Sequence, residues 1–156
     1  MIVLGIDPGL VSTGFALIKP NNHNYSAIRI GEIKTHSRSA MPDRLAKIFS
    51  NVSSLIGEYG PDEVAVEELF YAKNPKVALM MGHARGAALV AAAEHHVPVA
   101  EYSPREIKLA ITGFGNASKE QVKRMVIARL SIDPASIGYD ESDALAVAIC
   151  HCQRSH

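Results

Sequence analysis

The sequence predicts an α/β protein in which a five-stranded mixed sheet carries helices on both faces. Two observations lead to this prediction. Residues 1–33 contain three segments rich in aliphatic and β-branched residues, separated only by turns, as in an antiparallel meander. Residues 44–102 then alternate between helical and strand-like hydrophobic periodicity, which is typical of parallel strands joined through helices.

Length and composition are those of an ordinary globular protein. The 156 residues fit a single domain spanning 1–156, with 47% hydrophobic and 21% charged residues. The 16 basic residues balance the 16 acidic ones, which argues mildly against a nucleic-acid-binding protein. A neutral total can nevertheless combine a basic face with an acidic pocket, so the distribution of charge has to decide.

The two ends of the sequence bear on the compartment. Met1 leads directly into an apolar segment, without the basic leader of a secretory signal, and no apolar run approaches the roughly 20 residues of a membrane span. Cys150 and Cys152 are therefore expected to be reduced thiols in the cytoplasm, with Cys150 buried and the residues after it frayed. Their proximity to His151 and His156 could suggest zinc, but a second matching cluster is missing.

The first strand is expected over 1–7, where four large aliphatic residues precede Asp7 and a Pro-Gly turn. A second strand at 13–18 and a third at 25–33 follow, with a turn at 20–22, and all three pair antiparallel.

The remaining elements follow from periodicity and capping. Residues 44–59 carry one apolar helical stripe, and 62–67 alternate as a strand that should pair parallel with the first. Ser118 and Gln121 form a capping box that opens a helix to about residue 130. The other expected elements are a loop at 69–75, a helix at 76–95, a strand at 97–102, a short helix from Pro104, a flexible link at 113–116, a loop at 134–139 and a last helix at 141–151.

Four carboxylates lie where this topology can bring them together. Asp7 and Glu67 end the two strands that should be parallel neighbours, and Asp140 and Asp143 are spaced i and i+3 near the start of the last helix. Asp7 shares its strand face with Gly5, and small residues on that face would let a helix approach closely. The four acids are thus expected to meet in one cleft.

Each acid also has a simpler explanation. Asp7 could accept hydrogen bonds from its own Pro-Gly turn. Asp140 could be the N-cap of the last helix, with Asp143 as its capping-box partner. Glu67 and Glu68 could form a solvated strand end.

A shared cleft favours a cation. Four carboxylates repel one another strongly unless positive charge neutralises them. Oxygen ligands without accompanying His or Cys suit Mg²⁺ or Mn²⁺ rather than zinc. Two such ions are a common device for in-line displacement at a phosphodiester, so this donor set predicts two Mg²⁺ ions per subunit, with Mn²⁺ as a substitute.

These residues carry a resemblance. Ile6-Asp7-Pro8-Gly9 with Thr13-Gly14, Val66-Glu67-Glu68-Leu69-Phe70 with Ala72-Lys73-Asn74, and Asp140-Glu141-Ser142-Asp143-Ala144 resemble the RuvC family of Holliday junction resolvases, as do Ala84-Arg85-Gly86 and the 113–119 link. The likeness covers nearly the whole chain and contains four separated motifs in order.

The resemblance implies a ribonuclease H-like fold, a homodimer, and Mg²⁺-dependent paired nicks in opposing strands of four-way DNA junctions. Such cleavage leaves 5′-phosphate and 3′-hydroxyl ends and serves homologous recombination and DNA repair. The family's catalytic and metal-binding acids fall on Asp7, Glu67, Asp140 and Asp143. The resemblance further implies a junction-binding branch-migration helicase complex as partner, and a cytoplasmic, nucleoid-associated location.

Aromatic and basic residues near these motifs are the expected DNA contacts. Phe70 and Tyr71 follow the Glu67 strand, and an exposed ring there could stack on an unpaired base, although a loop aromatic can also fold back on the core. The family implies stacking by Phe70, and it marks Lys108 and Lys119 as phosphate contacts. The full set of expected contacts is Phe70, Tyr71, Lys73, Lys76, Arg105, Lys108 and Lys119.

Three questions stay open in the sequence. The first hairpin also resembles the phosphate loop of actin-like ATPases and sugar kinases, although 156 residues leave no room for their second lobe. A DNA-binding module without catalysis is a second alternative, against which the four acids argue. The helix at 76–95, rich in small residues, could pack closely on the sheet or pair with its copy across a two-fold axis.

Overall fold

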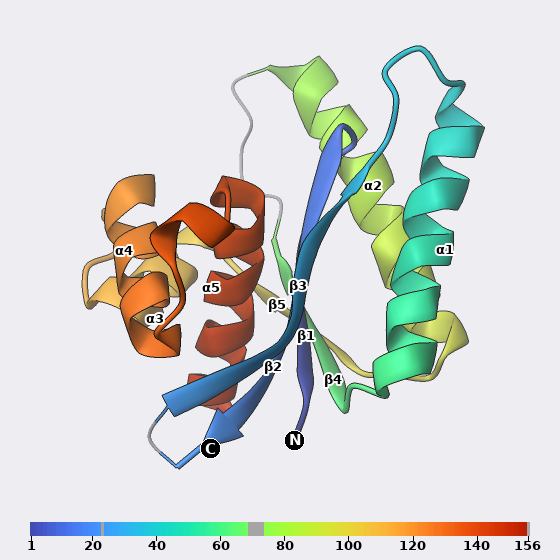
Figure 1. Cartoon of the computed structure of the whole chain (residues 1–156). Coiled ribbons are helices and arrows are strands. Elements are labelled where there is room, and N and C mark those ends of the chain that lie inside the picture. The colour runs from blue at the N-terminus through green and yellow to red at the C-terminus, as the bar shows by residue number, and fades with distance from the viewer. Residues whose placement is uncertain (23, 69–73, 156) are drawn as a thin grey trace.

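The computed structural model describes residues 1–22, 24–68 and 74–155. Its centre is a mixed sheet in the order β3-β2-β1-β4-β5 (Figure 1). Strands β1 (Val3–Asp7), β2 (Ser12–Asn21) and β3 (Asn24–Lys34) pair antiparallel. Strands β4 (Glu63–Glu67) and β5 (Val99–Tyr102) add to the other side of β1 in parallel. The predicted arrangement of three antiparallel and two parallel strands is confirmed.

Helices cover both faces of this sheet, as predicted. Helices α1 (Met41–Tyr59) and α2 (Pro75–Glu94) lie on one face, and α3 (Pro104–Thr112), α4 (Lys119–Leu130) and α5 (Tyr139–Arg154) lie on the other (Figure 1). The alternation of β4 decides which core each side chain joins. Val64 and Val66 pack in the core with α1 and α2, whereas Ala65 packs in the core with α5.

Several boundaries differ from the prediction. Strand β2 continues through Pro20, which pairs with Tyr25, so the turn at Asn22 is tighter than expected. A 3-10 turn, Pro134–Ser136, lies in the expected loop before the last helix. The expected strand at 97–102 begins at Val99.

The expected frayed C-terminal tail is wrong. Helix α5 continues to Arg154, and Cys152 is buried like Cys150. Burial raises the pKa of both thiols to about 11, which keeps them protonated and unreactive at neutral pH. The last helix is long because its apolar face crosses the whole sheet, from the carboxyl end of β1 back to its beginning.

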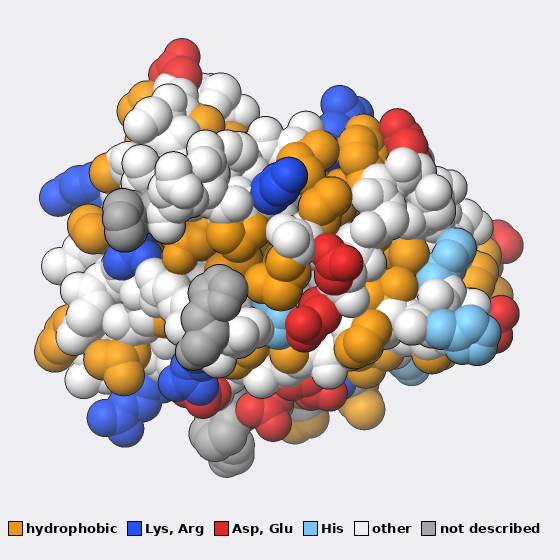
Figure 2. All heavy atoms as spheres, turned by 90° about the horizontal axis from the view of Figure 1, so that it is seen from below, with side chains coloured by type: hydrophobic (Ala, Val, Ile, Leu, Met, Phe, Trp, Pro, Cys, Tyr) orange, Lys and Arg blue, Asp and Glu red, His pale blue; other side chains and the backbone are white. Residues whose placement is uncertain are grey.

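The face seen from below in Figure 2 lies toward the marked termini of Figure 1, at the amino end of β1, and its basic, acidic and apolar side chains are interspersed. Among the helices that the structure describes, none is both long enough and apolar enough to span a bilayer.

Candidate active site

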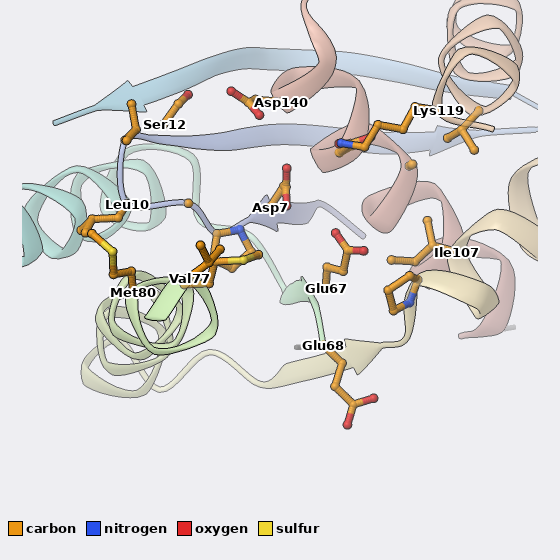
Figure 3. A pocket seen from close by; sticks show the side chains of 18 of the residues that line it. Asp7, Leu10, Ser12, Glu67, Glu68, Val77, Met80, Ile107, Lys119 and Asp140 are labelled. Carbon is orange, nitrogen blue, oxygen red and sulfur yellow. The ribbon is translucent and has the colours of Figure 1, made fainter. Parts of the chain in front are cut away.

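Asp7 and Glu67 stand side by side because their strands are parallel neighbours in register. Asp7 ends β1 and Glu67 ends β4, and the residues before them, Ile6 and Val66, are register partners. Both side chains point into the same cleft (Figure 3).

Two glycines seat α5 on this end of the sheet. A side chain on Gly5 would run into the Ala144 carbonyl and come within 2.7 Å of the Ala148 side chain. A side chain on Gly14, the register partner of Asp7, would run into the backbone of Asp140. Because neither glycine has a Cβ, the helix packs directly on the backbone of β1 and β2. This confirms the expected close approach.

The start of α5 carries its two aspartates into the cleft rather than capping the helix. The N-cap is Gly138, whose amide donates to the Glu141 side chain at 3.0 Å. The alternative in which Asp140 caps the helix with Asp143 as partner is therefore wrong. The turn alternative for Asp7 fares no better, since the Gly9 amide donates to the Thr13 hydroxyl at 3.3 Å.

The cleft has a volume of about 840 Å³. It lies between the carboxyl ends of β1 and β4, the start of α5, and the helices α2 and α3 (Figure 3). All four predicted acids line it, together with two of the predicted basic residues. Its charged lining residues are Asp7, Glu67, Glu68, Asp140, Asp143, Lys108 and Lys119.

Burial and mutual repulsion make these carboxylates hard to ionise together. Burial, then repulsion from Glu67, Asp143 and Asp140, raises the pKa of Asp7 to about 8. Burial also raises the pKa of Glu67 and of Asp143, and in both cases the charge of Lys119 opposes the rise. A positive charge bound in the cleft at neutral pH would therefore stabilise the ionised form of these carboxylates.

Lys119 supplies part of this positive charge. Its ammonium lies 3.3 Å from Asp143, and the same carboxylate, more than any other group, raises the pKa of Lys119. The donor set of the cleft consists of carboxylate oxygens, which suits a hard divalent cation. Within residues 1–22, 24–68 and 74–155, no three acidic, histidine or cysteine side chains are gathered tightly enough to enclose an ion as they stand. The case for a cation in this cleft therefore depends on the negative charge of its carboxylates and on their oxygen atoms as ligands.

The predicted DNA contacts divide into three groups. Lys108 and Lys119 line the cleft. Lys76 is exposed at the start of α2, and Arg105 packs its side chain against Gly115 in the link between α3 and α4. Phe70, Tyr71 and Lys73 lie outside the described residues.

The structure also shows contributors that the motifs did not indicate. Arg44 is buried, and its guanidinium donates to the Thr35 hydroxyl at 2.8 Å and to the Leu10 carbonyl at 3.4 Å. Thr35 also donates to Leu10, so these two side chains hold the turn that follows Asp7. Apolar residues of α2 and of this turn line the cleft as well, namely Leu10, Val11, Val77, Met80 and Met81.

Comparison with known proteins agrees with this geometry. The family model described as "Crossover junction endodeoxyribonuclease RuvC" matches residues 3–151. A protein of that name from Alkaliphilus metalliredigens is 44% identical over 156 residues, covering 100% of this chain and 95% of its own. Another from Legionella pneumophila is 45% identical over 150 residues, covering 96% and 86%.

Solved structures give the same result. The RuvC of T. thermophilus in complex with a Holliday junction substrate superimposes with a TM-score of 0.92 at 35% identity, covering 97% of this chain and 93% of that one. The yeast mitochondrial resolvase Ydc2 is 14% identical with a TM-score of 0.65, which shows a shared fold alone. The mixed sheet is thus the ribonuclease H-like sheet that the resemblance implied, and the chain belongs to the RuvC family of crossover junction endodeoxyribonucleases.

Proposed function

We infer that this protein is a metal-dependent endonuclease that resolves four-way DNA junctions by paired, symmetric hydrolysis of phosphodiester bonds in opposing strands. The observation that carries this inference is the convergence of Asp7, Glu67, Asp140 and Asp143 on one cleft, in a chain of the RuvC family. The relatives named above support the substrate, since one of them was solved with a Holliday junction. The ATPase alternative and the purely DNA-binding alternative account neither for the four acids in one cleft nor for the match to a family of endonucleases.

The four acids are the proposed catalytic and metal-binding residues. The raised pKa values of Asp7, Glu67 and Asp143 support a neutralising cation, and the carboxylate oxygens of the four acids suit Mg²⁺, with Mn²⁺ as substitute. Two such ions per subunit would supply an activated water and stabilise the leaving 3′ oxygen. Asp7, whose pKa is raised to about 8, would give up its proton to hold positive charge at the end of its strand. The products would be 5′-phosphate and 3′-hydroxyl ends.

Lys108 and Lys119 are the proposed phosphate contacts at this site. Both line the cleft, on the side formed by α3 and α4. Lys119 would have two roles: its ammonium neutralises Asp143, and it lies where a DNA phosphate would approach the acids. Contacts of this kind position the backbone and carry no sequence information.

The exposed side of α2 supports a homodimer. One side of this helix packs in the core through Ala84, Ala88, Ala91 and Ala92. Its other side leaves Leu79 and Val90 strongly exposed. A helix that is apolar around its circumference is normally covered on all sides. Pairing of two α2 helices across a two-fold axis would cover both residues and supply the two sites that a symmetric junction needs.

The biological setting follows from the substrate. Four-way junctions arise in homologous recombination and DNA repair, so a junction-binding branch-migration helicase complex is the proposed partner. Chromosomal DNA as substrate would place the enzyme in the cytoplasm at the nucleoid.

A synthetic four-way junction tests the proposal. One strand at a time is end-labelled, and the protein is incubated with it in Mg²⁺ or in EDTA, beside a linear duplex of the same sequence. We expect symmetric nicks in two opposing strands of the junction, only with the metal, and ligation of the products without further treatment. ATP hydrolysis without nicking of the junction would make the ATPase alternative the better one.

A further inference from the structure

The cleft has two unlike walls. The acids and Lys119 occupy one side, toward α5 and α4, whereas Leu10, Val77 and Met80 face them from the other (Figure 3). Val11 and Met81, which follow Leu10 and Met80 in the chain, also line the cleft. We call the four residues Val11, Val77, Met80 and Met81 the apolar wall.

Two residues of the apolar wall are open to solvent, and the two methionines are partly buried. Val11 is 64% exposed and Val77 is 46% exposed, although they come from the β1–β2 turn and from the first turns of α2. Ile107 and Val122, which also line the cleft, are buried beneath the surface. Exposed apolar groups gathered in a cleft mark a binding surface.

The turn side of this wall is held firmly. Leu10 beneath it is buried in the core, and its carbonyl accepts hydrogen bonds from Arg44 and Thr35. The α2 side is more adaptable, because methionine side chains fit differently shaped partners. The wall thus combines a fixed edge with a deformable one.

A nucleotide matches a cleft divided in this way. Its phosphate is negatively charged and would be attracted by Lys119 and by cations at the acids. The face of its base is apolar and can pack against the apolar side chains of the wall. A cleft of about 840 Å³ is large enough for a ligand well beyond a phosphate group. We propose that the apolar wall receives the face of the nucleobase next to the scissile phosphate and so positions that phosphate over the acids.

This inference rests on the proposed function and adds a positioning surface to it. Contact through apolar side chains reads the shape of a base rather than its hydrogen-bonding edge. Methionines tolerate several shapes, so the wall would rank bases by fit without rejecting any of them outright.

The test is a double-mutant cycle between protein and DNA. The wall variant combines Val77→Thr with Met80→Gln, two nearly isosteric changes to polar side chains. The control variant combines Val99→Thr with Met125→Gln, since these residues are 36% and 39% exposed and lie on β5 and α4. Val11→Thr tests the turn side of the wall separately from the α2 side.

Single-turnover cleavage is measured on a four-way junction and on two derivatives, in which an abasic residue replaces the base on the 5′ or the 3′ side of the scissile phosphate. We expect one abasic derivative to slow the wild-type protein about tenfold. The wall variant should be slowed about tenfold on the intact junction, and the abasic residue should slow it less than about twofold further. The control variant should behave like the wild type.

Three results would overturn the inference. One is that the wall substitutions and the abasic residue slow cleavage independently, so that the two fold-reductions in rate multiply. Another is that the wall variant cleaves the intact junction as fast as the wild type. The third is that light scattering finds the wall variant monomeric where the wild type is dimeric, because the wall would then be a protein contact. A wild-type protein that cuts no four-way junction would instead refute the proposed function itself, which separates the two failures.

Discussion

Asp7 and Gly14 are register partners on neighbouring antiparallel strands, and the backbone of Asp140 lies directly over Gly14. A residue without a side chain thus allows an acid from the last helix to approach an acid from the first strand. The same device recurs at Gly5, under Ala144 and Ala148. Assembly of the site depends on these two contacts as much as on the acids.

Loss of the charge on Asp7 should abolish cleavage and spare binding. Asp7→Asn keeps the shape of the side chain but removes a negative charge from the centre of the acidic cluster, so we expect junction cleavage in Mg²⁺ to fall by at least about 100-fold. Gel-shift titration of a labelled junction measures binding beside single-turnover cleavage. Glu68→Gln is the matched control, because Glu68 is exposed and directed away from Asp7 and Glu67 (Figure 3). Cleavage retained by Asp7→Asn would contradict the assignment.

The same substitution should stabilise the protein in the absence of metal. The pKa of Asp7 is raised to about 8 in the folded state, so the folded protein holds a proton that the unfolded chain releases near pH 4. Wild-type stability should therefore fall as the pH rises from about 4 to about 8, and level off above that. Asp7→Asn lacks this loss, and its advantage in Tm should grow over that range, at about 2–4 °C per kcal/mol.

Thermal unfolding in EDTA between pH 5 and pH 9 measures this difference. Added Mg²⁺ should raise the Tm of the wild type at pH 8 more than that of Asp7→Asn, because bound cations stabilise the folded state that binds them. A Tm difference that does not change with pH would show that Asp7 is not the group that titrates.

Lys108 and Lys119 should each account for about one phosphate contact. In an Asp7→Asn background that prevents cleavage, Lys108→Gln and Lys119→Gln should each weaken binding to all junction sequences alike. Each should also reduce the slope of log affinity against log salt by about 1. Lys47→Gln on α1 is the control, since Lys47 is exposed on the opposite face of the sheet. If the slope were unchanged in both variants, neither lysine would contact a phosphate, and the DNA would follow another path across the protein.

A side chain at Gly14 should misplace α5. The methyl group of Gly14→Ala would overlap the Asp140 backbone, and overpacking of this kind costs about 1–3 kcal/mol. We expect a lower Tm together with a loss of cleavage, because Asp140 and Asp143 would move with the helix. Gly57→Ala, within α1 and without a close neighbour, should instead be neutral or stabilising by about 0.5–1 kcal/mol. Equal effects of the two substitutions would show that Gly14 only affects backbone freedom.

Phe70 lies outside the described residues, and the resemblance alone assigns it a stacking role. Phe70→Ala should reduce junction cleavage more than junction binding, because a stacked ring would hold the opened junction rather than capture it. Single-turnover cleavage and gel-shift titration of the same junction separate the two effects. Equal losses would indicate that Phe70 only packs against the protein.

Much of the fold could be read from local patterns. The alternation in 62–67 predicted which residues face each core, and the capping box of Ser118 and Gln121 predicted the start of α4. The pairing of Asp7 with Glu67 followed as well, because parallel neighbours end at the same edge. Capping of α5 could not be predicted in this way, since Asp140 suits an N-cap whereas Gly138, the observed N-cap, was expected in a loop.

By itself, the sequence determined the order of the strands and helices, the family, and the four acids, because each of these depends on residues close together in the chain or on strict alternation. The tertiary structure alone decided that Arg44 and Thr35 secure the turn after Asp7, and that Val11 and the methionines of α2 line the same cleft as the acids. These relationships join residues far apart in the chain. Their physical cause is the close packing of the helices on the sheet, which no local pattern records.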